Sequence, residues 1–421
     1  MHGRTVFYID APSVLHPSWT SGRLLAAVYL FQQNFLLRLL SMDVENSLDE
    51  ASVQSRKNQQ GKSTIYVLGD VEEHAETYSK AIAENGSSIK ATAEIGGPSH
   101  SPQTCKPQKR YISNGGTNMA SLFTKQGHKG TNQDTMLVIE KFVSHHNTTF
   151  GGVFDGHGRH GHLVARHVRD VLPEKLKVSW QDQHQAAREG LYLSDYGDLG
   201  NHSLEELTSK HVLIDAWKEA FRTAFKLTDR ELLVNDTLDC FASGTTAVVV
   251  VRQGNDLLVG NVGDSRAILG ARDDDGSLLA IQLTVDSKPD EPREAERIKR
   301  YDGRVFALQR EPSVHRVWLP HRNAPGLAMS RALGDYCLKN NGLISVPEVT
   351  YRRLTKRDEF VVLATDGVWD VLSNEDVAAI VASTPNRAFA ARAVVEHAVH
   401  VWRSKYAHWR VDDCAVVCLF L

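Results

Sequence analysis

Five aspartates lie next to apolar segments of the sequence, in positions that could place them together at a sheet edge. Asp155, Asp264 and Asp366 each follow such a segment, directly or after one or two residues. Asp412 and Asp413 immediately precede another. Buried carboxylates are unfavourable unless they are paired or bind a metal, and clustered carboxylates repel one another, so their convergence would require divalent cations. Oxygen-only ligands favour magnesium or manganese over zinc.

The dipeptide Asp-Gly, which occurs at Asp155 and at Asp366, is also common in turns that bind no metal. Either dipeptide alone is explained as a turn. The combination with His157, and with Asp370 four residues after Asp366, favours a catalytic cluster. A histidine that titrates near neutral pH beside carboxylates is a candidate general acid.

Zinc binding by histidine is an alternative interpretation of the same region. His157, His160 and His162 are close in sequence, but their spacing is not that of a helical metal pair, and no cysteine lies nearby. We therefore rank a zinc enzyme well below a magnesium or manganese enzyme.

Short, β-branched apolar runs predict the strands that would position the carboxylates. Because these runs are nearly continuous, we expect strands buried on both faces. The runs are 148–154, 245–251, 360–364 and 414–421. Residues 256–262 and 265–271 predict a hairpin with a tight turn at Gly263 and Asp264.

Helical spacing of apolar residues predicts helices that cover the sheets. Helices are expected at 162–172, 212–227 and 388–402. Another is expected to start at Ser373, whose hydroxyl can cap its first turn. The polar segment 181–210 is interpreted as a surface insertion.

The first 118 residues are predicted to be an N-terminal extension, and 119–421 the catalytic domain. Residues 85–118 are rich in Ser, Gly, Pro, Thr and Lys and are typical of a linker. Residues 21–42 predict a helix. One interpretation is a targeting or membrane-interface segment, and the other is a helix docked on the surface or sequence upstream of a start at Met42. Polar residues interrupt its apolar run, which argues against a stable membrane span.

The charge balance indicates which kinds of partner to expect, and the cysteine content indicates the cellular compartment. Lys and Arg total 48 against 51 Asp and Glu, and the formal net charge is −3, which gives no reason to expect nucleic acid as a partner. The five cysteines are scattered, which fits a reducing compartment. We expect a cytoplasmic or nuclear location.

Five motifs together resemble the 2C-type, metal-dependent protein serine/threonine phosphatases, in the order found in that family. They are Phe154-Asp155-Gly156-His157-Gly158, Ser243-Gly244-Thr245-Thr246-Ala247, Gly263-Asp264-Ser265-Arg266-Ala267, Ser330-Arg331-Ala332-Leu333-Gly334-Asp335 and Ala364-Thr365-Asp366-Gly367-Val368-Trp369-Asp370. The likeness runs from about Leu122 to Leu421. The segment Lys129 to Asp134 is most similar to the plant branch.

This resemblance implies an α+β fold, a four-layer α/β/β/α sandwich with two Mg²⁺ or Mn²⁺ ions in a cleft at one edge. It also implies hydrolysis of phosphoserine and phosphothreonine in proteins by a hydroxide that bridges the two ions, in plant signal transduction. Phosphorylated proteins are then the substrates, and a monomer is expected.

The residue roles follow from the same resemblance. Asp155 would bridge both ions, the Gly156 carbonyl would bind one, and Asp366 and Asp412 would bind the other. Asp134 would hold metal-bound water. Asp264 and Asp370 would form a weaker third site. His157 would protonate the departing oxygen.

Three positions depart from the common family pattern. Lys129 stands where many members carry a phosphate-binding arginine, Gln133 where many carry glutamate, and Asp413 where asparagine is frequent. Lysine keeps the positive charge but loses the planar fork, so looser phosphate orientation is expected. An interaction protein without turnover is therefore the second hypothesis.

The segment 286–335 corresponds to the family's flap, where substrate choice is expected to lie. Trp318 within it is interpreted as flap packing, with a partner anchor as the alternative.

Overall fold

The computed structural model describes residues 109–143, 147–194, 202–405 and 410–421. The predicted helix at 21–42 lies outside these residues, as does most of the predicted linker at 85–118. The last part of that linker forms two short strands, so the prediction of a linker fails there.

One antiparallel sheet has a main path of six strands. In spatial order they are β1 (Lys109–Tyr111), β4 (Asp134–Glu140), β5 (Thr148–Gly158), β7 (Ala247–Gln253), β8 (Asp256–Val262) and β15 (Glu348–Arg353). Two short strands, β6 (Ser243–Thr245) and β14 (Leu333–Gly334), extend the sheet beside the end of β5.

The second antiparallel sheet has six strands. In spatial order they are β10 (Leu278–Gln282), β9 (Arg266–Arg272), β16 (Asp358–Ala364), β17 (Cys414–Phe420), β3 (Ala120–Lys125) and β2 (Gly115–Gly116). The strand nearest the C-terminus is therefore central, paired on one side with β16 and on the other with β3.

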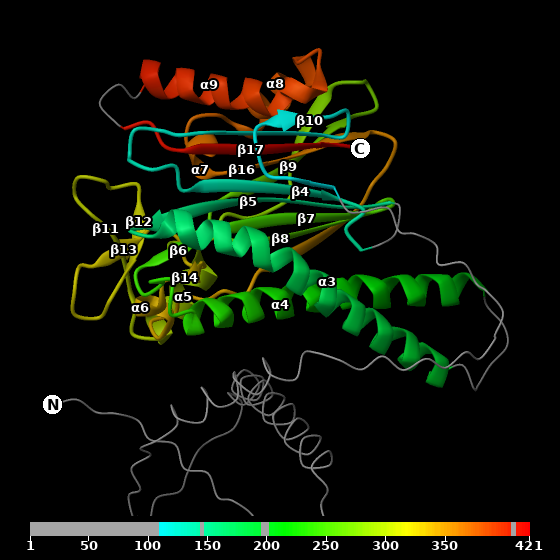
Figure 1. Ribbon diagram of the computed structural model, residues 1–421, viewed down its shortest axis with the longest axis horizontal. Helices are drawn as coiled ribbons and strands as arrows, with labels where there is room; N and C mark the ends of the chain where they lie inside the picture. Colours follow the sequence, from blue (N-terminus) through cyan, green and yellow to red (C-terminus); the bar gives the residue numbers. More distant parts are fainter. Residues whose placement is uncertain (1–108, 144–146, 195–201, 406–409) are drawn as a thin grey trace, which may run out of the picture. The chain divides into compact units, whose positions relative to one another are not determined.

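The two sheets pack face to face, and each is covered by helices on its outer side (Figure 1). The first carries α3 (Gly161–Ser194) and α4 (His202–Val234), and the second carries α8 (Asn374–Ser383) and α9 (Ala390–Lys405). Val248 and Val250 of β7 lie in the core between the sheets, whereas Val249 and Val251 lie in the core under the helices. Alternation of side chains along a strand explains why so continuous a valine run is buried on both faces. The predicted α/β/β/α sandwich is confirmed.

The predicted hairpin at residues 256–271 is wrong. Both strands form, but β8 pairs with β7 and β15 in the first sheet, and β9 pairs with β10 and β16 in the second. The intervening Gly263–Ser265 segment carries the chain from one sheet to the other. Gly263 has φ +99°, a conformation that favours glycine, and a Cβ there would meet the side chain of Thr246.

The predicted surface insertion at 181–210 is largely helical. Helix α3 continues to Ser194 with Pro173 inside it, and α4 already begins at His202. Residues 181–186, which begin this polar segment, are exposed or half-buried, so their polar composition marks the surface of a helix and not a loop. Ser373 caps α8 as predicted, because its Oγ accepts the Asp376 N–H at 3.1 Å.

The predicted flap forms a small subdomain with a core of its own around Ile298, Val317 and Leu338. Its elements are α5 (Pro292–Arg300), β11 (Arg304–Ala307), β12 (His315–Trp318) and β13 (Pro325–Leu327), and after β14 comes α6 (Tyr336–Lys339). Trp318 is 4% exposed, stacks on Phe306 and donates its indole N–H to the Phe306 carbonyl at 3.0 Å. These contacts favour the interpretation of Trp318 as flap packing.

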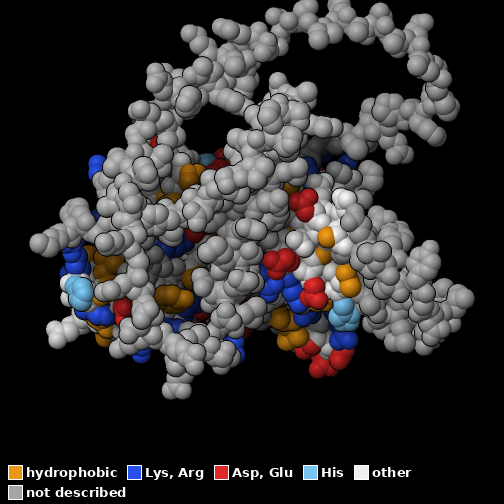
Figure 2. Space-filling view, turned by 90° about the horizontal axis from the view of Figure 1, so that it is seen from below, with side chains coloured by type: hydrophobic (Ala, Val, Ile, Leu, Met, Phe, Trp, Pro, Cys, Tyr) orange, Lys and Arg blue, Asp and Glu red, His pale blue; other side chains and the backbone are white. Residues whose placement is uncertain are grey.

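Two short elements complete the second sheet's outer side, namely α7 (Asp366–Trp369) and the 3-10 turn η1 (Arg387–Phe389). None of the described helices combines the length and the apolar character that crossing a bilayer requires. Where described side chains are visible in Figure 2, acidic and basic groups lie near one another, and neither sign dominates.

Candidate active site

Asp134 and Asp155 lie on neighbouring strands of the first sheet. The register of β4 and β5 makes them Cα partners. Asp134 begins β4, but Asp155 lies inside β5, because the strand continues to Gly158 by pairing with β6. The prediction that every carboxylate lies at a strand end is therefore wrong for Asp155.

The second sheet contributes the remaining main candidates. Asp366 begins α7 and is separated from the end of β16 by Thr365. One turn later, the Asp370 N–H donates to the Asp366 carbonyl at 2.8 Å. Asp412 precedes the start of β17, the strand that pairs with β16. The adjacent strands thus bring these carboxylates to the same end of the sandwich.

Burial and mutual repulsion raise the carboxylate pKa values. Burial, followed by the charges of Asp134, Asp366 and Asp412, raises the pKa of Asp155 well above its usual range. Burial, then the charges of Asp264, Asp370 and Asp412, raises the pKa of Asp366 to about 8. The site thus disfavours its own ionised carboxylates unless positive charge is present.

Two lysines already contact this cluster. Lys129 Nζ contacts Asp412 Oδ2, and Lys288 Nζ lies 2.5 Å from Asp264 Oδ2. Burial lowers the pKa of Lys288, but the Asp264 charge outweighs it and the pKa is raised. The Lys129 side chain is 53% exposed and lies on a carboxylate, so its expected phosphate-binding role stays a prediction.

The candidate ligands fit hard divalent cations in chemistry and electrostatics. They are carboxylates and the Gly156 carbonyl, and the Asp264 Oδ1 atom is buried with no hydrogen-bond partner in the described part of the chain. As placed, no three His, Cys, Asp or Glu side chains of the described residues are arranged to share an ion. Lys129 contacts one oxygen of Asp412, which is one of the candidate ligands.

His157 is bound to a carboxylate that the sequence reasoning did not assign. Its Nε2 atom lies 2.6 Å from Asp335 Oδ2, and the Asp335 side chain is only 3% exposed. Burial lowers the pKa of His157, but the charge and hydrogen bond of Asp335 outweigh burial and raise it. Asp335 thereby favours the protonated imidazole and orients its ring. Asp335 is the last residue of the motif that begins at Ser330, but nothing in the sequence spacing indicated a histidine 178 residues earlier as its partner.

Further hydrogen bonds fix the carboxylates. Thr365 Oγ1 donates to Asp134 Oδ2 at 2.7 Å. Asp413 accepts the Gly127 N–H through Oδ1 at 2.7 Å and the Gln133 N–H through Oδ2 at 2.9 Å. Thr365 carried no sequence signal of this role, because one threonine before an Asp-Gly pair is a common pattern.

The predicted site residues mostly come together. Electrostatic interactions join Lys129, Asp134, Asp155, His157, Asp264, Asp366, Asp370 and Asp412. The Gly156 N–H donates to the Gln133 carbonyl at 3.2 Å, and a side chain at position 156 would meet the Gly161 backbone. Of the other predicted histidines, His160 has its Nδ1 atom 3.8 Å from Asp239.

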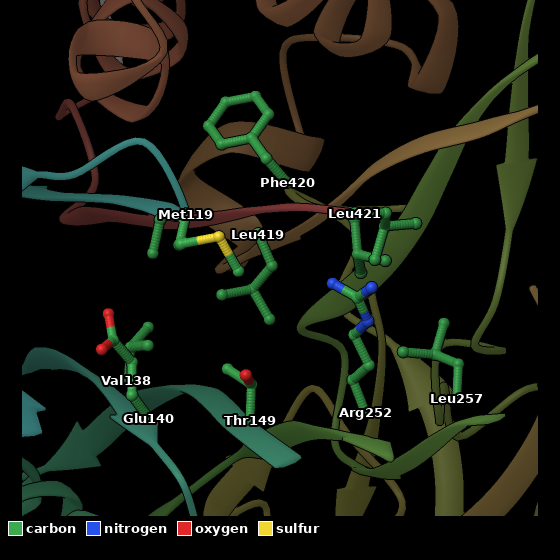
Figure 3. Close-up of a pocket in the computed structure, with 11 residues that line it drawn as sticks. Met119, Val138, Glu140, Thr149, Arg252, Leu257, Leu419, Phe420 and Leu421 are labelled. Atoms are coloured by element: carbon green, nitrogen blue, oxygen red, sulfur yellow. The ribbon is translucent and has the colours of Figure 1, made fainter. Parts of the chain in front are cut away.

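A cavity between the sheets lies at the other end of the sandwich (Figure 3). Its lining includes Thr149 of β5 and Leu419 of β17, with Arg252 beside them. Thr149 precedes Asp155 by six residues, which corresponds to about 20 Å along a strand. A cavity of about 20 Å³ has room for roughly one water molecule, so it does not compete with the carboxylate cluster as the substrate site.

Comparisons with known proteins agree with the geometry. The family model for protein phosphatase 2C matches residues 118–404. A probable protein phosphatase 2C 1 of Arabidopsis thaliana is 56% identical over 74% of this chain and 68% of its own length. A probable protein phosphatase 2C 75 of Oryza sativa subsp. japonica is 54% identical over 74% of each chain.

A solved structure extends the likeness to the fold. The serine-threonine phosphatase 2C of Toxoplasma gondii superposes with a TM-score of 0.63 and 26% identity, over 75% of this chain and 99% of that one. Sequence, fold and carboxylate cluster lead to one conclusion: the chain belongs to the protein phosphatase 2C family, the metal-dependent protein serine/threonine phosphatases.

Proposed function

We propose that the chain removes phosphate from phosphoserine and phosphothreonine in proteins with two Mg²⁺ or Mn²⁺ ions held at the carboxylate cluster. The observation that carries the proposal is the convergence of buried and half-buried carboxylates from both sheets, with pKa values raised by desolvation and repulsion. Divalent cations bound there relieve this repulsion.

We propose the ligand set that the family resemblance implies. Asp155 of β5 would contact both ions, and the Gly156 carbonyl would bind one of them. Asp366 and Asp412 are proposed to bind one ion, and Asp134, held by Thr365, to orient its water. Asp264 and Asp370 are proposed to form a weaker third site.

The bound ions supply Lewis acidity, which activates water and offsets phosphoryl charge. The protein's own residues do the rest. His157 donates a proton to the serine or threonine oxygen as it leaves, and Asp335 holds the imidazole ring in its orientation. Lys129, once off Asp412, provides positive charge for the phosphoryl oxygens.

The test uses purified full-length protein with a phosphothreonine peptide. Phosphate release is expected with Mn²⁺ or Mg²⁺ and is expected to stop on chelation and resume on re-addition of metal. His157→Ala is expected to slow release on the order of 100-fold while Mn²⁺ binding, measured by calorimetry, persists. Activity that is insensitive to chelator would contradict the proposal.

We also propose a monomer acting in the cytoplasm or nucleus. The four cysteines among the described residues are free, which fits a reducing compartment; they are Cys240, Cys337, Cys414 and Cys418. Light scattering of the purified protein tests the monomer, and imaging of a fluorescent fusion tests the compartment. A dimer mass or a secreted fusion would contradict these two points.

A further inference from the structure

Asp229 on helix α4 binds the segment 334–339, which contains the carboxylate partner of His157. Its Oδ1 accepts the Gly334 N–H at 2.9 Å. Both carboxylate oxygens accept from Lys339 Nζ, at 3.0 and 2.8 Å. The hydroxyl of Tyr336 donates to the Asp229 backbone carbonyl. One helical residue thus contacts the segment on both sides of Asp335.

Asp335 adopts a backbone conformation that residues other than glycine adopt uncommonly, although aspartate does so more readily than most. Its φ is +54°, in the left-handed region, where a residue other than glycine costs about 1 kcal/mol. Its own N–H donates to the Ser243 carbonyl at 3.1 Å, and the Tyr336 N–H donates to the Cys240 carbonyl at 3.2 Å. These two bonds hold the main chain from one side, and Asp229 holds it from the other.

The contacts of Asp229 are largely shielded from water. The side chains of Asp229 and Lys339 are 13% and 17% exposed, and Lys339 Nζ also donates to the Ala332 carbonyl at 2.8 Å. Without the negative charge of Asp229, the Lys339 ammonium would keep only neutral acceptors, one of them the single amide oxygen that the Gly334 N–H also needs. Groups left unsatisfied in this way tend to shift until they find water. A shift of Gly334 moves Asp335, whose side chain lies 2.6 Å from His157.

We infer that Asp229 is a positioning residue for proton donation, acting on His157 through Gly334 and Asp335. The inference rests on the proposed function, in which His157 protonates the leaving oxygen. Asp229 contacts none of the candidate metal ligands in the part of the chain that the structure describes, so its effect on catalysis is separable from metal binding.

The experiment compares two substrates that differ in their need for a proton. p-Nitrophenyl phosphate releases a stable phenolate, whereas a phosphothreonine peptide releases an alkoxide that must be protonated. In Asp229→Asn, kcat for the peptide is expected to fall on the order of 10-fold further than kcat for p-nitrophenyl phosphate. KM for both substrates and Mn²⁺ affinity by calorimetry are expected to stay near the wild-type values.

Glu231→Gln is the matched control. Glu231 lies two residues further along α4 and also binds a lysine, Lys175, at 2.6 Å, but it faces α3 through His167 rather than the segment 334–339. Its loss is expected to lower the melting temperature without changing the ratio of the two kcat values. A general loosening of α4 would change both variants alike.

A second variant covers the case in which Asp229→Asn does not fold. Tyr336→Phe removes only the hydroxyl that reaches Asp229, and the same change in the kcat ratio is expected, smaller in size. Equal losses on both substrates in the folded variant, or the same ratio change in Glu231→Gln, overturn the inference. His157→Ala separates the two proposals. If only His157→Ala changes the ratio of the two kcat values, the role of Asp229 is wrong and that of His157 stands. If His157→Ala does not change this ratio either, the proposed role of His157 as proton donor is also wrong.

Discussion

Asp134 and Asp155 lie directly opposite each other on adjacent antiparallel strands, Asp134 buried and Asp155 half-buried. Like charges in this arrangement are destabilising. Protons or cations must offset the charge of this pair, so the strand register is one physical reason why divalent cations are expected to bind here.

Asp155→Asn is expected to abolish metal-dependent stabilisation. Wild-type protein should melt at a higher temperature with Mn²⁺, because a ligand that binds only the folded state stabilises it. The variant should show no such shift and a loss of phosphatase activity on the order of 100-fold or more. Differential scanning calorimetry with and without Mn²⁺ measures the effect.

Asp256→Asn provides the control for that experiment. Asp256 opens β8 at the end of the sheet away from the cluster and binds Arg353 and Tyr351. Its metal-dependent shift should equal that of the wild type. A full Mn²⁺ shift in Asp155→Asn would remove Asp155 from the ligand set.

Lys129→Met is expected to change metal and substrate binding in opposite directions. Removal of an ammonium from Asp412 frees that carboxylate, so Mn²⁺ should bind about 5-fold more tightly. The substrate loses a positive charge near its phosphoryl group, so KM should rise. Calorimetry and steady-state kinetics measure the two effects, and Lys129→Arg should retain both wild-type values more closely. A parallel loss of metal and substrate binding would contradict the placement of Lys129.

Glu294 should make the protein sensitive to acid. Its carboxylate accepts hydrogen bonds from Arg297, Arg331 and Ser330, which outweigh burial and lower its pKa from 4.5 to about 2. Because the folded pKa is below the unfolded one, the stabilisation is present above about pH 4.5 and is lost as the pH falls towards 2. Between about pH 6 and pH 3 the loss is on the order of 2 kcal/mol.

Urea unfolding of Glu294→Gln tests this sign and size. At about pH 6 the variant should be less stable than wild type by about 3 kcal/mol, because two half-buried arginines lose their carboxylate. Its stability should then fall less steeply with acid. Glu296→Gln, on the exposed side of α5, should keep the wild-type slope. An identical slope in wild type and Glu294→Gln would contradict the assignment.

Asp413→Asn tests a departure from the common family pattern. The two oxygens of Asp413 each accept one backbone N–H, from Gly127 and from Gln133. Asparagine has one acceptor oxygen, so one N–H loses its partner at a cost of about 1 kcal/mol. Thermal unfolding should show this loss, with Asp376→Asn on the exposed cap of α8 as a comparison for a lost surface contact. Unchanged or increased stability would indicate that the loop has another acceptor.

The sequence predicted the strands of the sandwich well because their periodicity is local. Runs such as 148–154 and 414–421 are apolar on both faces, and both became strands covered on both sides. The predicted hairpin at 256–271 failed because pairing partners are chosen by the whole fold, and a glycine turn between two strands is equally able to cross between sheets.

The candidate site was likewise predictable where the signal is local and unpredictable where distant segments meet. Aspartates next to apolar runs could be recognised individually, since a strand boundary is a local signal. The partner of His157 could not, because Asp335 is brought there by a left-handed backbone conformation and by α4. Lys288 and Thr365 likewise bind carboxylates through contacts that join distant segments.

The crossing at Gly263–Ser265 and the central place of β17 have a consequence for how activity appears during folding. Carboxylates come from both sheets, and Asp412 precedes the strand that completes the middle of the second one. A chain with only one sheet formed, or one that ends before residue 410, cannot assemble the cluster. Catalysis thus depends on the closed sandwich, and a chain in which one of the two sheets is unformed is expected to be inactive.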